Sequence, residues 1–275
     1  MLKDILESLY QKYNRPELIK PDPLQFVYRY TDPGDMEIVG FLAADLAYGR
    51  VQQIEKSLTA LFAVMGRSPS AFVRSFDAAG RRALRLFKHR FTAGDDISDL
   101  LALLRRVLLK YGSIEQFFLR GYDPADANII PALTRFCGTL SQMYADEHNG
   151  RVTAGIQYLV ASPERGSPCK RLNLFLRWMV RDDQVDAGLW KSVDKAKLIV
   201  PLDVHMGRLC RILGLYHQKT PSLAAALKIT ESFLEIHPQD PVKYDFALSR
   251  IGILEGCNGK YALRCRDCDL KDFCR

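Results

Sequence analysis

The sequence predicts an all-α protein built as two packed lobes. Apolar residues recur every three or four positions along most of the chain, which is the spacing of a helix with one apolar face. Alternating apolar and polar runs with hairpin turns, which indicate strands, are nearly absent. The chain has 275 residues, of which 48% are hydrophobic. Because one helical core rarely grows to this size, we expect two lobes.

The predicted helices follow one another with short breaks marked by Pro and Gly. Plausible capping residues stand before three of them, at Asp35, at Ser113 and at the Thr220-Pro221 pair. The two tryptophans, Trp178 and Trp190, are expected in the core rather than as stacking platforms. The helical segments are residues 36–66, 96–119, 129–147, 170–181, 203–215 and 222–236.

The overall charge favours a polyanionic partner. The formal net charge is +7 and the pI is about 9.0. A total of this size indicates such a partner only if the charges cluster on one face. No uninterrupted apolar stretch marks a signal peptide, and no apolar run approaches the length of a membrane span. We therefore expect a cytoplasmic protein with reduced thiols and no membrane partner.

Four of the seven cysteines lie in the last nineteen residues, with the spacing Cys-x7-Cys-x2-Cys-x5-Cys. Thiolates this close in sequence can converge on one metal centre, and disulfides are disfavoured in a reducing compartment. Zinc and a [4Fe-4S] cluster both accept four thiolates, so the spacing leaves the two nearly level. The predicted ligands are Cys257, Cys265, Cys268 and Cys274.

This tail resembles the iron–sulfur loop that ends endonuclease III and the adenine-mispair glycosylases, whose first gap is one residue shorter. The segment CRDCDLKDFC carries the resemblance. The resemblance implies a structural 4Fe-4S cluster, with zinc as the alternative, that holds a basic loop against DNA phosphate. Lys260, Arg264 and Arg266 are the residues expected to make that contact. Ordinary solvation of a polar loop is the competing interpretation of these three.

Asp203 carries a second resemblance. The segment Val200-Pro201-Leu202-Asp203-Val204-His205 resembles the Val-Asp-Val-His segment of the 8-oxoguanine glycosylases, with Pro201-Leu202 inserted. In local terms Asp203 is the N-cap of a helix predicted over 204–213. The resemblance implies in addition that Asp203 is catalytic and that His205 lies at the DNA.

Lys170 is the expected catalytic lysine. Gly166-Ser167-Pro168-Cys169-Lys170-Arg171 resembles the Gly-x-Gly-x-Lys hairpin of the helix–hairpin–helix glycosylases. Pro168 replaces the second Gly and removes a backbone donor. The hairpin residues Gly166 and Arg171 are expected to contact DNA. A lysine at a helix start opposes the helix dipole, which fits a functional role, although a solvated lysine is the alternative.

The gap between Lys170 and Asp203 is 33 positions. In endonuclease III and the common 8-oxoguanine enzymes the gap is about eighteen, whereas an archaeal branch has a long gap. A short helix over 185–193 is the expected content of the extra stretch. A further resemblance lies at residues 41–51, where the superfamily has a turn that inserts side chains into DNA. Tyr48 and Arg50 are the candidates, and a plain turn between core helices is the alternative.

Together these features predict a two-lobed helix–hairpin–helix glycosylase fold with a C-terminal four-cysteine loop. The segments DPVKYDFALSRIGI and KRLNLFLRWMVR also resemble the uncharacterised bacterial DUF2400 group. The expected function is a DNA glycosylase and AP lyase acting as a monomer on double-stranded DNA with an oxidised base, 8-oxoguanine favoured. The alternative is a non-enzymatic nucleic-acid-binding protein on the same scaffold. The expected divisions are 1–34 (N-terminal helices), 35–150 (six-helix lobe), 151–256 (hairpin and Asp203) and 257–275 (cluster loop).

Overall fold

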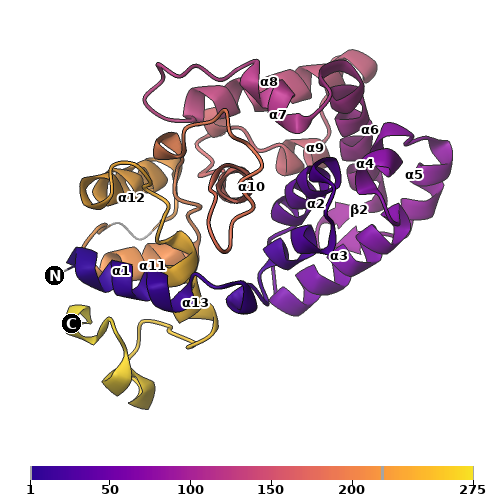
Figure 1. Cartoon of the computed structure of the whole chain (residues 1–275). Helices are drawn as coiled ribbons and strands as arrows, with labels where there is room; N and C mark the ends of the chain where they lie inside the picture. The colour runs from indigo at the N-terminus through magenta and orange to yellow at the C-terminus, as the bar shows by residue number, and fades with distance from the viewer. Residues whose placement is uncertain (1, 218–219, 275) are drawn as a thin grey trace. The chain divides into compact units, whose positions relative to one another are not determined.

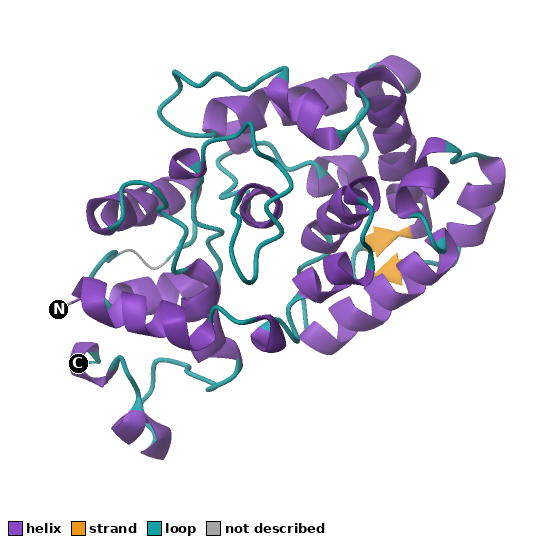
Figure 2. Cartoon of the chain, in the orientation of Figure 1, coloured by secondary structure: helices purple, strands orange, loops and turns teal. Residues whose placement is uncertain are grey.

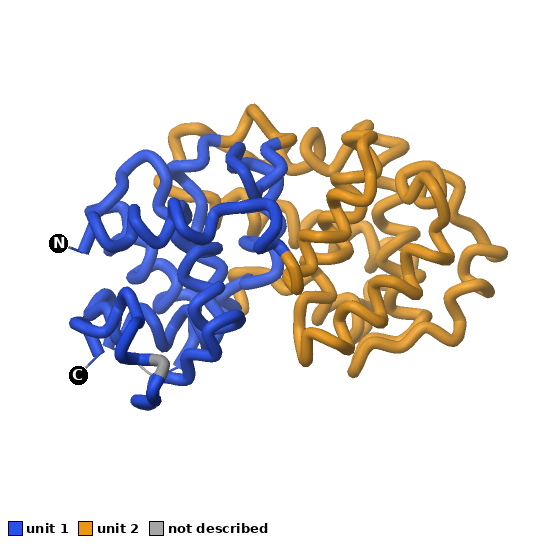
Figure 3. Tube along the Cα trace, turned by 60° about the horizontal axis from the view of Figure 1, so that its bottom comes forward, with its two compact units in different colours: residues 1–19, 166–188, 194–275 blue, residues 20–165, 189–193 orange. Residues whose placement is uncertain are grey.

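The computed structural model describes residues 2–217 and 220–274 and confirms the helical fold class. Within the described residues, helices account for the regular structure apart from one short hairpin (Figures 1 and 2). The chain divides into two compact units, coloured separately in Figure 3. Unit 1 comprises Met1–Ile19, Gly166–Gly188 and Asp194–Arg275, and unit 2 comprises Lys20–Arg165 and Leu189–Val193.

Unit 2 is built around α2, in which every residue from Glu37 to Asp45 is buried. A helix that is apolar on all sides belongs inside a protein, and η2 and α4 pack against it. The elements of unit 2 are η2 (Pro23–Arg29), α2 (Pro33–Asp45), α3 (Val51–Met65), α4 (Pro69–Arg74), α5 (Ala78–Leu84), β1 (Lys88–His89), β2 (Thr92–Ala93), α6 (Gly94–Tyr111), α7 (Ile114–Leu119), α8 (Ile130–Glu147), α9 (Ala154–Leu159) and η3 (Pro163–Arg165).

A buried carboxylate joins separate parts of unit 2. Glu37 accepts hydrogen bonds from the backbone N–H groups of Ile114 and Glu115, both at 2.8 Å, and so satisfies the start of α7. It also accepts one from Trp190 Nε1 at 2.9 Å. Burial raises the pKa of Glu37, and these three donors oppose that rise. The short segment 189–193 is thereby tied into unit 2 although its neighbours in sequence belong to unit 1.

Unit 1 joins the first helix of the chain to its last third. Helix α13 contacts both α1 and α11. Glu7 on α1 accepts hydrogen bonds from Lys243 at 2.7 Å and from the Tyr244 hydroxyl at 2.6 Å. The elements of unit 1 are α1 (Leu2–Tyr13), η1 (Pro16–Leu18), α10 (Lys170–Val180), η4 (Lys195–Lys197), α11 (Val204–Ile212), α12 (Leu223–Ile236), α13 (Asp245–Ile253), η5 (Leu263–Asp267) and η6 (Lys271–Phe273).

The two units divide the chain differently from the sequence-based boundaries. The expected break at residue 150 falls between Arg165 and Gly166, and residues 1–19 join the C-terminal part instead of standing apart. Leu6 and Leu9 are buried on α1, so the helix needs a partner, and α13 provides it. Contacts between segments this distant in sequence leave no local pattern.

The prediction of a short helix over residues 185–193 is wrong. The segment instead makes a β-bridge between Asp182 and Ala187. Asp183 Oδ1 accepts the backbone N–H groups of Val185 and Asp186, both at 2.8 Å, which competes with helix formation. Gly188 follows with φ of 58°, outside the right-handed helical region.

Three further expectations concern caps and the core. Ser113 caps α7 as predicted, accepting the Gln116 N–H at 3.0 Å. The cap of α2 is Asp32 rather than Asp35, and the cap of α12 is Ser222 rather than the preceding pair. Trp178 and Trp190 are both buried, which confirms their placement in the core. No helix in the described ranges is both long enough and apolar enough to cross a bilayer.

Candidate functional site

Lys170 is the first residue of α10, and the short segment of residues 166–169, where the resemblance places the hairpin, leads into it. Gly166 has φ of 73° and Cys169 has φ of 47°, so two hairpin residues adopt the left-handed region. Cys169 pays a steric penalty there that Gly does not. Burial raises the pKa of the Cys169 thiol to about 11, which argues against a nucleophilic cysteine at this position.

Two side chains hold the hairpin in shape. The Cys169 N–H donates to Ser167 Oγ at 3.1 Å, and Asn173 Nδ2 donates to the Pro168 carbonyl at 3.0 Å. Asn173 lies on the buried face of α10, so the hairpin is tied to the helix that it introduces. These hydrogen bonds fix the backbone position of Lys170. The residue is half-buried, so part of its side chain is accessible to solvent.

Asp203 is the N-cap of α11, as the sequence predicts. Its Oδ1 accepts the backbone N–H groups of His205 at 2.9 Å and Met206 at 2.8 Å. Both bonds use the same oxygen, and Oδ2 makes no hydrogen bond within the described part of the chain. Asp203 is half-buried, so one carboxylate can cap the helix and still present a second oxygen.

The charges of Lys170 and Asp203 both influence the pKa of a third residue, Asp245. Asp245, the first residue of α13, is buried, and burial raises the pKa of its carboxyl. The guanidinium of Arg177 is the strongest opposing influence. The Asp203 carboxylate raises the pKa of Asp245 further and the Lys170 ammonium lowers it. Lys170 and Asp203 are therefore both within electrostatic range of one buried carboxyl in unit 1.

A network of buried ion pairs supports this region. Arg177 on α10 binds Asp245 and, through Nε at 3.2 Å, Asp186. Arg181, one turn later, binds Asp186 and, at 3.0 Å, Asp240. Buried charges of this kind require partners, and each carboxylate here has one. Through the buried Arg177–Asp245 pair, the network fixes α10, which carries Lys170, against α13.

The other residues predicted to lie near Lys170 and Asp203 differ in exposure. Gly166 is exposed, and Arg171 and His205 are half-buried. His205 Nδ1 is buried and has no hydrogen-bond partner within the described residues. The ring lies close to Gly252 of α13, where a Cβ would come within 3.2 Å of Nδ1. A side chain at position 252 would therefore press on His205.

The C-terminal thiols influence one another. Burial raises the pKa of Cys274, and the charges of Cys268, Cys257 and Cys265 raise it further. Backbone N–H groups point at two of the sulfurs, from Ala262 to Cys265 and from Leu270 to Cys268, each at 3.4 Å. Such donors stabilise thiolates in iron–sulfur and zinc sites, so the donor set fits a four-thiolate centre chemically. Within the described residues the side chains are not arranged as a closed metal site.

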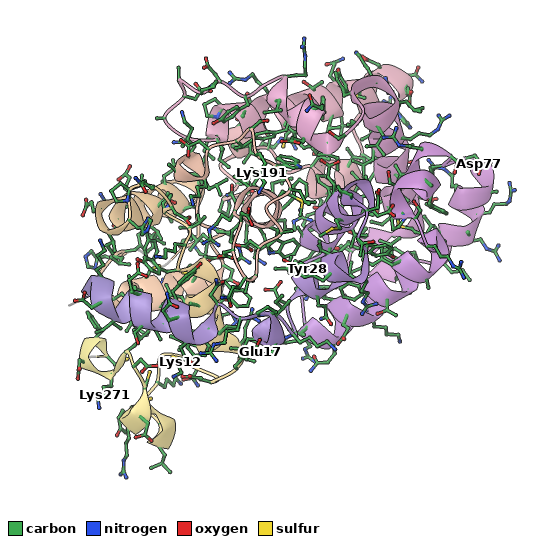
Figure 4. The ribbon with its side chains drawn as sticks, viewed as in Figure 1. Lys12, Glu17, Tyr28, Asp77, Lys191 and Lys271 are labelled. Carbon is green, nitrogen blue, oxygen red and sulfur yellow. The ribbon has the colours of Figure 1, made fainter. Side chains whose placement is uncertain are left out.

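Helices α1 and α11 anchor the tail. Lys12 on α1 binds Asp269 at 2.8 Å, and Figure 4 shows Lys12 beside the C-terminal segment that carries Lys271. Arg208 on α11 donates to the Cys257 carbonyl at 3.2 Å. Gly259 has φ of 76° and lies against the Arg208 side chain, where a Cβ would not fit. The loop therefore has fixed attachments in unit 1 that do not depend on a metal.

Two of the basic residues predicted to contact DNA from the tail are exposed. Lys260 and Arg266 are exposed. The Lys260 N–H donates to Asn258 Oδ1 at 2.9 Å, which makes a tight polar turn. Arg264 belongs to η5, but its side chain lies outside the described residues.

The predicted turn at residues 46–50 joins α2 to α3 in unit 2. Gly49 has φ of 99°, and Arg50 is the exposed residue that precedes α3. The Tyr48 hydroxyl is hydrogen-bonded to the His89 carbonyl at 3.0 Å and to Thr92 Oγ1 at 2.6 Å. Tyr48 is thus held against the β1–β2 hairpin, whereas Arg50 extends toward solvent.

An exposed aromatic cluster beside this turn was not foreseen. Phe91, between β1 and β2, is 70% exposed and lies parallel to the Tyr48 ring at 6.0 Å. Tyr158 of α9 meets both rings edge-on, at 5.2 Å and 5.9 Å. The Arg90 guanidinium lies 5.0 Å from the Phe91 ring. An aromatic residue outside any helical periodicity and next to an arginine was the sequence signal for this cluster.

Asp245 was missed for a different reason. It starts a helix in a stretch of mixed polarity, where an acidic residue is favoured by the helix dipole alone. Its proximity to Lys170 and Asp203 follows from tertiary packing between α10, α11 and α13.

Comparison with known proteins identifies a family and little more. No curated protein and no solved structure matches the chain. The model of the DUF2400 family, described as a protein of unknown function, matches residues 22–254. That range includes the hairpin, Lys170, Asp203 and Asp245 and ends before the four cysteines. The chain belongs to the DUF2400 family.

Proposed function

We propose that this protein is a DNA base-excision glycosylase with AP-lyase activity that acts on an oxidised base, 8-oxoguanine foremost. One observation carries the proposal: Lys170 and Asp203 each stand at the start of a helix of unit 1, and both charges act on the buried Asp245. An amine and a carboxylate in one electrostatic neighbourhood supply the nucleophile and the counter-charge that the reaction requires.

The chemistry assigns one role to each residue. The damaged nucleotide leaves the base stack, which costs a few kcal/mol, because its C1′ carbon is inaccessible within the duplex. As the bond from C1′ to the base breaks, positive charge develops on the sugar and Asp203 stabilises it. After the Lys170 ammonium gives up a proton, its nitrogen lone pair bonds to C1′, and the base departs with the electrons of the broken bond and takes up a proton. The sugar ring opens to a Schiff base, and loss of a C2′ proton expels the 3′ phosphate.

The two functions assigned to Asp203 are compatible in atomic detail. The cap uses Oδ1, and Oδ2 has no hydrogen bond within the described residues. A carboxylate held by two N–H groups is pre-oriented and loses little freedom when a sugar approaches. Capping and catalysis are therefore separable by substitution, since Asn keeps an oxygen acceptor but removes the charge.

DNA contact is proposed for exposed groups on each unit separately. On unit 2 these are Arg50 and the ring of Phe91 with the guanidinium of Arg90, a combination suited to stacking on an unpaired base. On unit 1 they are the exposed Lys260 and Arg266 of the tail, suited to phosphate. Tyr48 supports Phe91 through their parallel rings instead of inserting into DNA itself.

The tail is proposed to hold a [4Fe-4S] cluster through Cys257, Cys265, Cys268 and Cys274, with zinc as the alternative. When bound, the metal centre would stabilise the conformation of the loop and would take no part in the chemistry at the sugar. About four iron and four sulfide per chain, in a brown protein, support the cluster. One zinc in a colourless protein supports the alternative. Cys268→Ala is expected to lose the metal, and Cys210→Ala, a buried cysteine in α11, is expected to keep it.

Borohydride trapping tests the proposed reaction. The wild-type protein is incubated with duplex DNA containing 8-oxoguanine, and reduction converts the Schiff base into a stable adduct. Lys170→Gln is expected to give no adduct. Lys195→Gln, an exposed lysine of η4 in the same unit, is expected to behave like wild type. An adduct that persists in Lys170→Gln, with unchanged melting of both variants, would remove the lyase role from Lys170.

A non-enzymatic nucleic-acid-binding protein is the second candidate. Pro168 in the hairpin favours it, because proline offers no N–H group for a DNA phosphate. This candidate requires salt-sensitive DNA binding that survives Asp203→Asn, without strand cleavage on any oxidised base. Cleavage by wild type that is lost in Asp203→Asn excludes it.

A further inference from the structure

Unit 2 carries a groove that has no part in the proposed reaction. Two adjoining hollows, of about 480 Å³ and 370 Å³, lie where the end of α6 meets α7 and α8, three helices labelled in Figure 1. Both hollows are lined by Tyr111 and Thr139, so they lie next to each other on the surface. We refer to the two together as the α6–α8 groove.

The floor of the α6–α8 groove is aromatic. The rings of Tyr111 and Phe117 are 5.0 Å apart, and Phe117 is 5.0 Å from Phe136. Leu109, at the side of the smaller hollow, is 58% exposed. Gly138 on α8 faces open space, since a Cβ there would meet no atom within 4 Å. The groove therefore offers apolar surface and room for an approaching backbone.

The rim of the groove is positively charged. Arg106, Lys110, Arg120 and Arg135 line it, against one acidic residue, Glu164. Arg106 is paired with Glu147 at 3.0 Å and Arg135 with Asp126 at 2.8 Å. Lys110 and Arg120 form no ion pair with any carboxylate in the described part of the chain. These two cations are available to an anionic partner.

We propose that the α6–α8 groove binds an acidic peptide segment of a partner protein, with an aromatic or aliphatic side chain as its anchor. The apolar floor takes the anchor, and Lys110 and Arg120 take flanking carboxylates. A nucleic-acid backbone fits less well, because its phosphates would leave the aromatic floor unfilled. The inference stands independently of the proposed glycosylase activity, which uses other residues.

Peptide selection tests the chemistry of the partner. Short random peptides displayed on phage are selected on the immobilised full-length protein and again on the double variant Lys110→Glu, Arg120→Glu. We expect wild type to enrich acidic peptides that contain Phe, Trp or Leu, and the double variant to lose that enrichment. Enrichment of neutral or basic peptides, or an unchanged acidic set on the double variant, would overturn the proposal.

A direct binding measurement gives the affinity of the groove for such a peptide. A labelled synthetic peptide from the enriched set is titrated by fluorescence anisotropy. Reversal of both charges is expected to weaken binding at least about tenfold, and Leu109→Ser about threefold or more. Lys56→Glu, an exposed cation of α3 in the same unit, should leave it unchanged. Undamaged duplex DNA is the competitor: full displacement of the peptide by DNA would show that the groove binds phosphate and would contradict the proposal.

Discussion

Replacement of Arg177 by Met is expected to destabilise the protein severely. The Arg177 side chain is 1% exposed and its guanidinium binds two buried carboxylates, Asp186 and Asp245. Met keeps most of the volume but removes the charge, so Asp245 remains buried without its cation and Asp186 keeps only Arg181. Breaking a buried pair in this way costs about 3–5 kcal/mol. At about 2–4 °C per kcal/mol, the melting temperature should fall by about 6–20 °C.

Urea unfolding followed by circular dichroism measures this cost, and pH supplies a second check. Without Arg177 the pKa values of both carboxyls rise in the folded protein, so they bind protons more readily there than in the unfolded chain. The stability deficit should therefore be smaller at pH 5 than at pH 7. Lys228→Met is the control: Lys228 is 64% exposed beside Glu231, and such a pair contributes below about 1 kcal/mol. A deficit for Arg177→Met as small as that of the control would refute the reasoning.

Three further outcomes are expected. Burial raises the pKa of Asp186 to about 6, above its ordinary 3.8, so its contribution to stability is complete below about pH 4 and is lost as pH rises through 6. Asp186→Asn should remove that component from chemical denaturation curves; an unchanged pH profile would contradict it. Asp203→Ala should cost about 0.5–2 kcal/mol through loss of the cap, and Asp203→Asn clearly less, by thermal unfolding. Equal costs would mean that the cap does not depend on the oxygen. Phe91→Ala should leave the melting temperature unchanged but weaken binding to damaged duplex about fivefold or more, and equal affinity would remove Phe91 from the interface.

Local chemistry made parts of this fold predictable. Asp203 before an amphipathic run is a sufficient signal for the start of α11, and the apolar spacing after Lys170 is sufficient for α10. The capping residues of α2 and α12 were misplaced by two or three positions because several polar residues near each start can accept the same N–H groups.

The remaining features depend on contacts that sequence periodicity does not encode. The stretch around Val185 looked helical, but the Asp183 side chain takes its N–H groups and Gly188 turns the chain. The β1–β2 hairpin is too short for an alternating pattern, so exposed Phe91 escaped notice. Asp245 comes near Lys170 and Asp203 only through the packing of α13.

The central claim is that Lys170 attacks the sugar of a damaged nucleotide. Peptide mapping tests it most directly, since it uses the unaltered protein. Wild type is trapped with borohydride on duplex DNA containing 8-oxoguanine, the adduct is digested, and tandem mass spectrometry locates the modified lysine. The account predicts one sugar remnant, on Lys170 at the start of α10. A remnant on another lysine, or none on any oxidised base tested, would contradict it.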